Sequence, residues 1–334
     1  MRTPLCDLLG IEVPIVAAPI IAPVGVAAGP RFAAAVSEAG GLGTIALWLA
    51  EIDVLRTRIR DLKSLTEKPF AVNLRLDLDA APRLDACLEE GVRIVSMFWG
   101  DPSELAPRAK AAGAMVMQTV RSAKEAQIAV DCGVDVVVAQ GWEAGGHVWG
   151  TVATMALVPA VVDAVAPVPV VAAGGIADGR GMAAALALGA AGVWIGTRFL
   201  AAVETNFHAR YVERLLAASE TDTVYLENLF DGGPWTDAPA RTLRSQTVSE
   251  WETAGRPRAG QRPGETDIVA VSASRGEVKR YAPVAPVTDI EGDIDALPMW
   301  AGQGVGLVKK IQAAADIVRE IDAEAQAVLT RLGR

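Results

Sequence analysis

Cysteine and histidine are scarce in this chain, which limits the metal and redox sites that its own side chains can form. The 334 residues include three cysteines and two histidines. Cys6, Cys87 and Cys132 lie far apart in the sequence, without CxxC or Cys/His ligand spacing. Neither a disulfide framework nor a structural zinc site is therefore expected, and no metal site is predicted.

The chain also lacks an excess of basic residues and any long apolar run. Asp and Glu number 40 against 31 Lys and Arg, and the net charge of −9 argues against nucleic acid as a partner, because phosphate neutralisation needs a basic surface. The same charge disfavours binding to an anionic membrane. No apolar run of about 18 residues is present, and the amino terminus shows no secretory signal. We expect a soluble cytoplasmic protein.

What the chain does contain is a repeated pattern of a short β-branched run, a Gly, Pro or Asn break, and an Ala-rich helical stretch. The predicted strands are residues 15–20, 42–47, 70–76, 93–99, 114–120, 134–140, 168–175 and 191–200. These runs are apolar on both faces, as parallel strands covered by helices should be. Eight βα units favour an α/β fold of the closed (β/α)8 TIM-barrel type, with an open doubly wound sheet as the alternative.

The repeat ends after the eighth unit. Residues 216–301 are rich in Pro, Gly and charge, which favours a smaller C-terminal cap or lid, with a plain flexible insertion as the alternative. Apolar residues at helical spacing within 304–333 predict a last helix that packs back onto the barrel. The predicted division is a barrel made of residues 1–215 and 302–334 and a cap made of 216–301.

Three amides stand at predicted carboxyl ends of strands, where barrels of this kind form their active sites. They are Asn73, Gln118 and Gln140. A buried amide needs partners for both its oxygen and its nitrogen, and a single one is usually a satisfied core group. Three that converge on one end of a barrel favour a heterocyclic ligand with donor and acceptor edges.

Acid–base groups are few at the same strand ends. The sequence shows no paired carboxylates of a glycosidase, no carboxylate cluster for Mg²⁺ and no lysine inside a strand. Glu143 and His147 remain, within the stretch AQGWEAGGHVWG that follows the sixth strand. Two such groups are too few for most hydrolytic schemes, so we expect a cofactor to carry the chemistry.

Two glycine-containing turns predict a phosphate site. AAGGIADGRG follows the seventh strand and WIGTR ends the eighth, the positions where barrels commonly bind phosphate. Exposed backbone N–H groups at such turns bind phosphate dianions. The candidates are Gly174, Gly175, Gly196 and Thr197.

Four tryptophans lie at or just after the predicted strand ends: Trp48, Trp99, Trp142 and Trp149. Together they indicate an apolar mouth above the carboxyl ends of the strands, and packing at the rim of the barrel is the alternative for each one.

The stretch AQGWEAGGHVWG, followed by PVVAAGGIADGRGMAAALALGAAGVWIGTRFL, resembles the FMN-dependent nitronate monooxygenase family. The segments APIIAPVG…RFAAAVSEAGGLGTI, FAVNLRL and WAGQGVGLVKK also fit, so the resemblance spans nearly the whole chain. It implies an FMN-binding TIM barrel with a smaller cap. The implied reaction oxidises alkyl nitronates, with nitroalkanes as further candidates, by O₂ to a carbonyl compound and nitrite.

The resemblance also implies residue roles. His147 would be catalytic, either deprotonating a nitroalkane or, as an imidazolium, holding the nitronate. Asn73 and Gln140 would contact the isoalloxazine, and Gly145 the cofactor beside His147. The implied phosphate contacts are Gly175, Trp194, Ile195, Gly196 and Thr197, with Gln118 and Lys124 as weaker additions. The residues themselves add Gly146, which lets backbone approach a flat ring beside Gly145, and Gly174 at the phosphate turn.

GGHVWG carries one more residue than the GGHRG or GGHIG of the family, which moves Trp149 toward the substrate side. Relatives of this type also act as reductases that use NAD(P)H with a quinone or an enoyl thioester, so that activity is the alternative. A non-redox barrel that binds a phosphorylated metabolite is the candidate from another class. The sequence leaves a homo-oligomer open.

Overall fold

The computed structural model describes residues 1–20, 28–235 and 238–333. Residues 21–27, part of the APIIAPVG stretch and of the turn after it, and 236–237, within the predicted cap, lie outside the described residues. The main sheet contains eight strands in the order β1-β9-β8-β6-β5-β4-β3-β2. Its members are β1 (Ile15–Ala17), β2 (Gly43–Ala46), β3 (Phe70–Arg75), β4 (Ile94–Phe98), β5 (Met115–Val120), β6 (Val136–Gln140), β8 (Val170–Ala173) and β9 (Gly192–Ile195).

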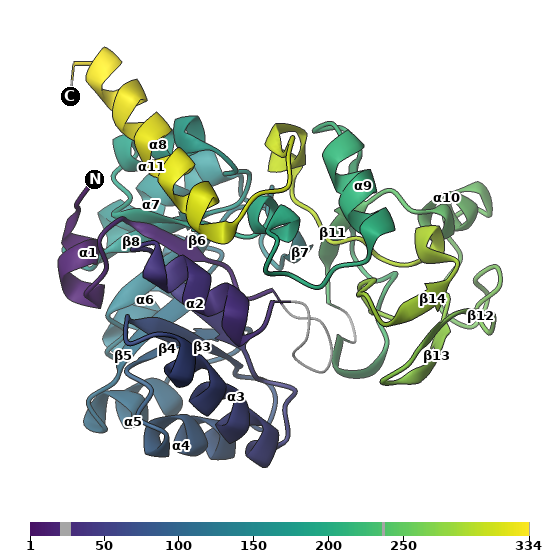
Figure 1. Cartoon of the computed structure of the whole chain (residues 1–334), viewed down its shortest axis with the longest axis horizontal. Helices are drawn as coiled ribbons and strands as arrows, with labels where there is room; N and C mark the ends of the chain where they lie inside the picture. Colours follow the sequence, from purple (N-terminus) through teal and green to yellow (C-terminus); the bar gives the residue numbers. More distant parts are fainter. Residues whose placement is uncertain (21–27, 236–237, 334) are drawn as a thin grey trace.

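The sheet closes into a barrel. Neighbouring strands pair in parallel, and a parallel bridge between Val16 and Leu42 joins the edge strands β1 and β2. The helices between the strands cover the outside of the sheet (Figure 1). The predicted (β/α)8 TIM barrel is confirmed, and the open doubly wound sheet is excluded.

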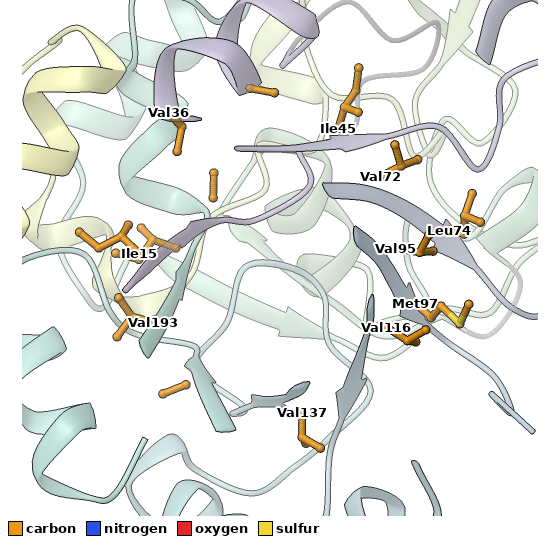
Figure 2. Packing of buried hydrophobic residues seen from close by; sticks show 14 of the residues in the cluster. Ile15, Val36, Ile45, Val72, Leu74, Val95, Met97, Val116, Val137 and Val193 are labelled. Atoms are coloured by element: carbon orange, nitrogen blue, oxygen red, sulfur yellow. The ribbon is translucent and has the colours of Figure 1, made fainter. Parts of the chain in front are cut away.

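Alternation along the strands divides the barrel core into two layers. Ile45, Val72 and Val95 belong to an outer layer between the strands and the helices, part of which is shown in Figure 2. Residues one position away, such as Ala71 and Ile94, belong to a separate cluster that fills the barrel interior. Both faces of each strand are therefore buried, which explains why the strands read as continuous apolar runs.

Seven helices follow strands of the barrel in the described part of the chain. They are α2 (Pro30–Glu38), α3 (Ile52–Leu65), α4 (Ala81–Glu89), α5 (Leu105–Ala111), α6 (Ala123–Asp131), α7 (Thr154–Val165) and α8 (Gly179–Ala187). A short helix, α1 (Pro4–Leu9), precedes β1 and contributes Leu5 and Leu9 to the interior cluster.

The helix of the eighth unit differs from its prediction. After β9 comes a 3-10 turn, η1 (Thr197–Ala201), and then α9 (Ala209–Ala217), whose Tyr211 and Leu215 pack in a second hydrophobic cluster away from the barrel. The C-terminal helix α11 (Ala314–Arg331) instead packs against α8 and α2, as the helix predicted to return to the barrel. An amphipathic pattern shows that a helix has one apolar face but does not show what covers that face.

The last helix also begins later than predicted. Residues 304–313 contain most of the 3-10 turn η4 (Gln303–Leu307) and then non-helical backbone, and α11 begins at Ala314. Gly304 and Gly306 explain the late start, because glycine costs about 1 kcal/mol relative to alanine inside a helix.

The residues between η1 and α11 supply most of two small sheets and of a second hydrophobic core, beside the barrel (Figure 1). One sheet joins β10 (Thr223–Leu226) and β11 (Ala240–Leu243) to β7 (Gly146–His147), and the other contains β12 (Ile268–Ser272), β13 (Gly276–Lys279) and β14 (Ile290–Gly292). The remaining elements are α10 (Gln246–Thr253), η2 (Gly233–Trp235) and η3 (Ile294–Ala296). We propose that this region is the cap, with α9 included in it.

Gly179 lets α11 pack directly on the first turn of α8. A Cβ at Gly179 would lie 2.4 Å from the backbone nitrogen of Ala325 and 2.6 Å from the backbone oxygen of Ile321. Because backbone cannot move aside cheaply, we expect Gly179→Ala to lower the free energy of unfolding by about 1–3 kcal/mol. Urea denaturation measures this change. Ala184→Ser, at an exposed position of α8, is the control, and an equal effect of both variants would contradict the assigned packing.

Candidate functional site

A cavity of about 210 Å³ lies at the carboxyl ends of the barrel strands. The residues that face it continue the barrel-interior positions at two-residue spacing, as when Asn73 follows Ala71 on β3. The cap closes the far side with Trp235, Pro283 and Trp300. Ten of the predicted site residues line this cavity: Asn73, Gln140, Gly145, Gly146, His147, Gly174, Gly175, Trp194, Gly196 and Thr197.

Gln118 and Ile195 do not line the cavity. On β5, Val116 and Val120 belong to the outer layer, so Gln118 between them points the same way, and its Nε2 donates to the backbone oxygen of Thr119 at 3.2 Å. Thr119, one residue further, lines the cavity instead. Ile195 likewise packs in the outer layer.

Asn73 presents an unused acceptor. Its Nδ2 donates to Oγ and to the backbone oxygen of Ser96 at 3.0 and 3.3 Å. Its Oδ1 is buried and has no hydrogen-bond partner among the described residues. A buried polar atom without a partner costs about 1–3 kcal/mol, so this oxygen fits a ligand that offers an N–H donor, as the ring edge of a flavin does.

The two predicted phosphate turns meet at one side of the cavity. Gly174 and Gly175 have φ angles of +108° and +72°, and a Cβ at Gly174 would lie 2.8 Å from Oγ1 of Thr154. A Cβ at Gly196 would meet only the Cβ of Ala18, at 3.3 Å. Asp178 caps the nearby N-terminus of α8 by accepting from the backbone N–H of Gly181 at 3.0 Å. We propose that the backbone of these two turns, at Gly174, Gly175 and Gly196, is the glycine cradle where a phosphate would bind.

His147 lies in β7, where it pairs with Ala240 of the cap strand β11. Burial and then the guanidinium of Arg75 lower the pKa of the His147 imidazole to about 3, and hydrogen bonding to the backbone of Pro239 and Ala238 opposes them. Nδ1 is buried and has no hydrogen-bond partner in the described ranges. A neutral imidazole of this kind favours the role of proton acceptor over that of a permanent cation.

The extra residue in GGHVWG does not change the cavity lining, because Val148 and Trp149 pack beside the cavity. Val148 is fully buried, and its N–H donates to the backbone oxygen of Pro239 at 2.9 Å. Trp149 stacks on Trp99 with ring centres 4.9 Å apart and an angle of 19°. Neither Val148 nor Trp149 lines the cavity, so the tryptophan nearest to the imidazole is a different one.

That residue is Trp235, which the sequence did not point to. Its indole stacks on the His147 imidazole with ring centres 3.3 Å apart and an angle of 13°. Arg241 was also missed: its Nη2 donates to the backbone oxygen of Trp142 at 3.0 Å and so fixes the turn that carries His147. Both residues lie in the proposed cap, where the sequence shows little periodicity. No sequence pattern there marks Trp235 or Arg241 as a site residue.

Two absences concern only the described part of the chain. No three His, Cys, Asp or Glu side chains there come together in a way that would hold a metal ion. Nor does any described helix have the length and apolar character needed to cross a membrane.

The lowered pKa of His147 has a consequence for stability. The unfolded chain takes up a proton at this ring below a pH of about 6.5, whereas the folded chain does so only near pH 3. Acidification through this window therefore favours the unfolded state, by up to about 1.4 kcal/mol per pH unit. We expect the wild type to lose unfolding free energy more steeply than His147→Gln between these limits. Parallel slopes in urea titrations would show that the ring is not held neutral.

Comparisons with known proteins identify the family and the fold of the chain. A family model described as nitronate monooxygenase matches residues 2–84 and 80–324. The FabK protein of Thermotoga maritima has a structure that superposes with a TM-score of 0.83 at 37% identity, covering 99% of this chain and 98% of that one.

Two curated relatives have different activities in their names. The (3aS,4S,5R,7aS)-5-hydroxy-7a-methyl-1-oxo-octahydro-1H-indene-4-carboxyl-CoA dehydrogenase of Mycobacterium tuberculosis is 42% identical over 77% of this chain and 70% of its own length. The nitronate monooxygenase of Pseudomonas aeruginosa is 32% identical over 92% of this chain and 95% of its own length. The comparisons agree on the fold and on oxidoreductase chemistry, and they differ in substrate.

Proposed function

This chain belongs to the nitronate monooxygenase family and is an oxidoreductase, and from that premise we propose that it uses FMN to oxidise alkyl nitronates with O₂ to a carbonyl compound and nitrite. The observation that carries the proposal is the shared cavity. The free acceptor of Asn73, the glycine cradle and a neutral His147 all face one space at the strand ends.

Each part of the chain has a separate task in this proposal. Asn73 and Gln140 orient the heterocycle, and the backbone at Gly175 and Gly196 holds the phosphate. When bound, FMN supplies the electron acceptor and the reaction with O₂. His147 accepts the proton from the carbon next to the nitro group when the substrate arrives as a nitroalkane. The tryptophans around the ring exclude water from the reacting atoms.

A second candidate is a flavin-dependent oxidoreductase that acts on an acyl thioester or uses NAD(P)H as reductant. It is favoured by the 42% identity to the carboxyl-CoA dehydrogenase. The two candidates share chemistry, because a thioester and a nitro group both acidify the neighbouring carbon and both give a planar anion when the proton leaves. Family membership therefore fixes the reaction type better than the substrate.

Anaerobic mixing separates the candidates. The FMN-loaded protein is mixed without O₂ with ethyl nitronate in one experiment and with NADH in another. Rapid loss of the visible flavin absorbance with ethyl nitronate alone supports the monooxygenase, and admission of O₂ should then release nitrite. Bleaching by NADH alone supports the reductase. Bleaching by neither reagent would contradict the monooxygenase and the NADH-dependent reductase alike, and would leave the oxidoreductase that acts on an acyl thioester.

The expected partners and the location of the protein in the cell are further predictions. We propose that the partners are small-molecule substrates and O₂, without nucleic acid or membrane, and that the protein is cytoplasmic. Size measurement in solution decides whether it forms a homo-oligomer.

A further inference from the structure

Arg75 is a buried cation next to the candidate site. It ends β3 two residues after Asn73, on the same side of the strand, and its side chain is 2% exposed. Asp77 accepts from its Nε and Nη2 at 2.6 and 2.7 Å. The guanidinium lies over the rings of Trp235, Trp48 and Trp99, at 3.9, 5.5 and 5.6 Å from their centres.

One nitrogen of this guanidinium is unused. Nη1 of Arg75 is buried, and it has no hydrogen-bond partner within residues 1–20, 28–235 and 238–333. Asp77 fixes the plane of the group through Nε and Nη2. Burying an arginine donor without a partner is costly, and a ligand with an oxyanion would remove that cost.

Trp235 separates Arg75 from His147. The imidazole lies 3.3 Å from the indole centre and the guanidinium carbon lies 3.9 Å from it. Two planar groups at such distances cannot share one face of the ring without overlapping, so they lie on opposite faces. The indole therefore fills a slot, one planar group thick, between a neutral base and a cation.

We propose that this slot is the binding site for the planar oxyanion of the substrate, which displaces the Trp235 indole and lies between the Arg75 guanidinium and the His147 imidazole. The chemical class is a nitronate or an enolate, both flat and negatively charged on oxygen. Arg75 then discriminates in favour of the anion over the neutral nitroalkane or thioester, and Trp235 sets how thick a group can enter. The inference rests on the proposed function for the identity of the substrate.

Nitrate tests the slot directly, because it is a flat oxyanion that cannot react. Calorimetric titration of the purified wild-type protein with nitrate is expected to show saturable binding, weakened about 10- to 100-fold in Arg75→Met. Arg75→Lys keeps the charge without the planar fork, so its affinity should lie between the two. Trp235→Phe should bind nitrate more tightly, since a smaller ring is displaced. A nitrate complex should show Trp235 moved away from His147.

Arg121 provides the matched control. Its guanidinium lies 5.1 Å from the centre of the Trp149 ring and pairs with Glu125 at the surface. Arg121→Met should therefore bind nitrate as the wild type does. The slot is refuted if the wild type binds no nitrate, if Arg75→Met binds it equally well, or if bound nitrate leaves the indole on the imidazole. Should Arg75→Met fail to fold, the lysine and phenylalanine variants decide. These titrations need no flavin turnover, so they fail independently of the proposed function.

Discussion

His147→Ala is expected to lower kcat/KM for nitroethane by about 10²- to 10⁴-fold, the usual contribution of a positioned base. The same variant should keep its FMN and lose much less activity with ethyl nitronate, which arrives already deprotonated. The reason is the state of the ring: burial and Arg75 hold its pKa near 3, so it is uncharged throughout the neutral range, and its basicity rises only when a negative charge forms on the substrate beside it.

Proton transfer to this ring creates an imidazolium across the Trp235 indole from the Arg75 guanidinium, and the repulsion between the two cations costs electrostatic free energy. The nitronate formed in the same step carries the opposite charge and offsets that cost. The two charges are therefore coupled, and the base works only with a substrate that becomes an anion within reach of it.

His208 is the control for this prediction. It is the other histidine of the chain, and its Nδ1 accepts from the backbone N–H of Arg210 at the start of α9. His208→Ala should oxidise nitroethane at the wild-type rate. Equal losses with nitroethane and ethyl nitronate in His147→Ala would show that the ring holds the anion instead of removing a proton.

Gly196→Asp is expected to weaken FMN binding by about 100-fold or more, because a carboxylate at the cradle repels the phosphate dianion and like charges in contact cost several kcal/mol. The fold should tolerate the change. A Cβ at Gly196 meets only the Cβ of Ala18, at 3.3 Å, whereas a Cβ at Gly174 would come within 2.8 Å of Thr154. Quenching of flavin fluorescence on titration measures the affinity.

Gly196→Ala adds the Cβ without the charge and separates crowding from repulsion. It should bind FMN far better than the aspartate variant, with a similar urea midpoint for both proteins. Wild-type FMN affinity in Gly196→Asp would place the phosphate elsewhere.

The barrel and most of the site were predictable because both depend on short-range patterns. Parallel strands buried on two faces read as apolar runs, and eight of them with helices between leave few folds. Asn73 and Gln140 were predictable for the same reason, since each continues the interior positions of its strand into the cavity. The same two-residue spacing predicts that Thr119, and not Gln118, faces the cavity from β5. On β3 it places Arg75 on the same side of the strand as Asn73.

The cap was not predictable in the same way. Trp235 and Arg241 act on the turn that carries His147 from about ninety residues further along the chain, through a stack and a backbone hydrogen bond. Such contacts leave no periodic trace in a sequence. The sequence also could not show that α11, and not α9, packs on the barrel. An apolar helix face does not specify which surface covers it.

The absorption spectrum of the purified protein, followed by identification of any cofactor released on denaturation, tests the central claim most directly. A flavin spectrum, with FMN released in an amount equivalent to the chain, is the result that the cradle, the free acceptor of Asn73 and the family predict. A stably folded, colourless protein that takes up no FMN on reconstitution would contradict the account.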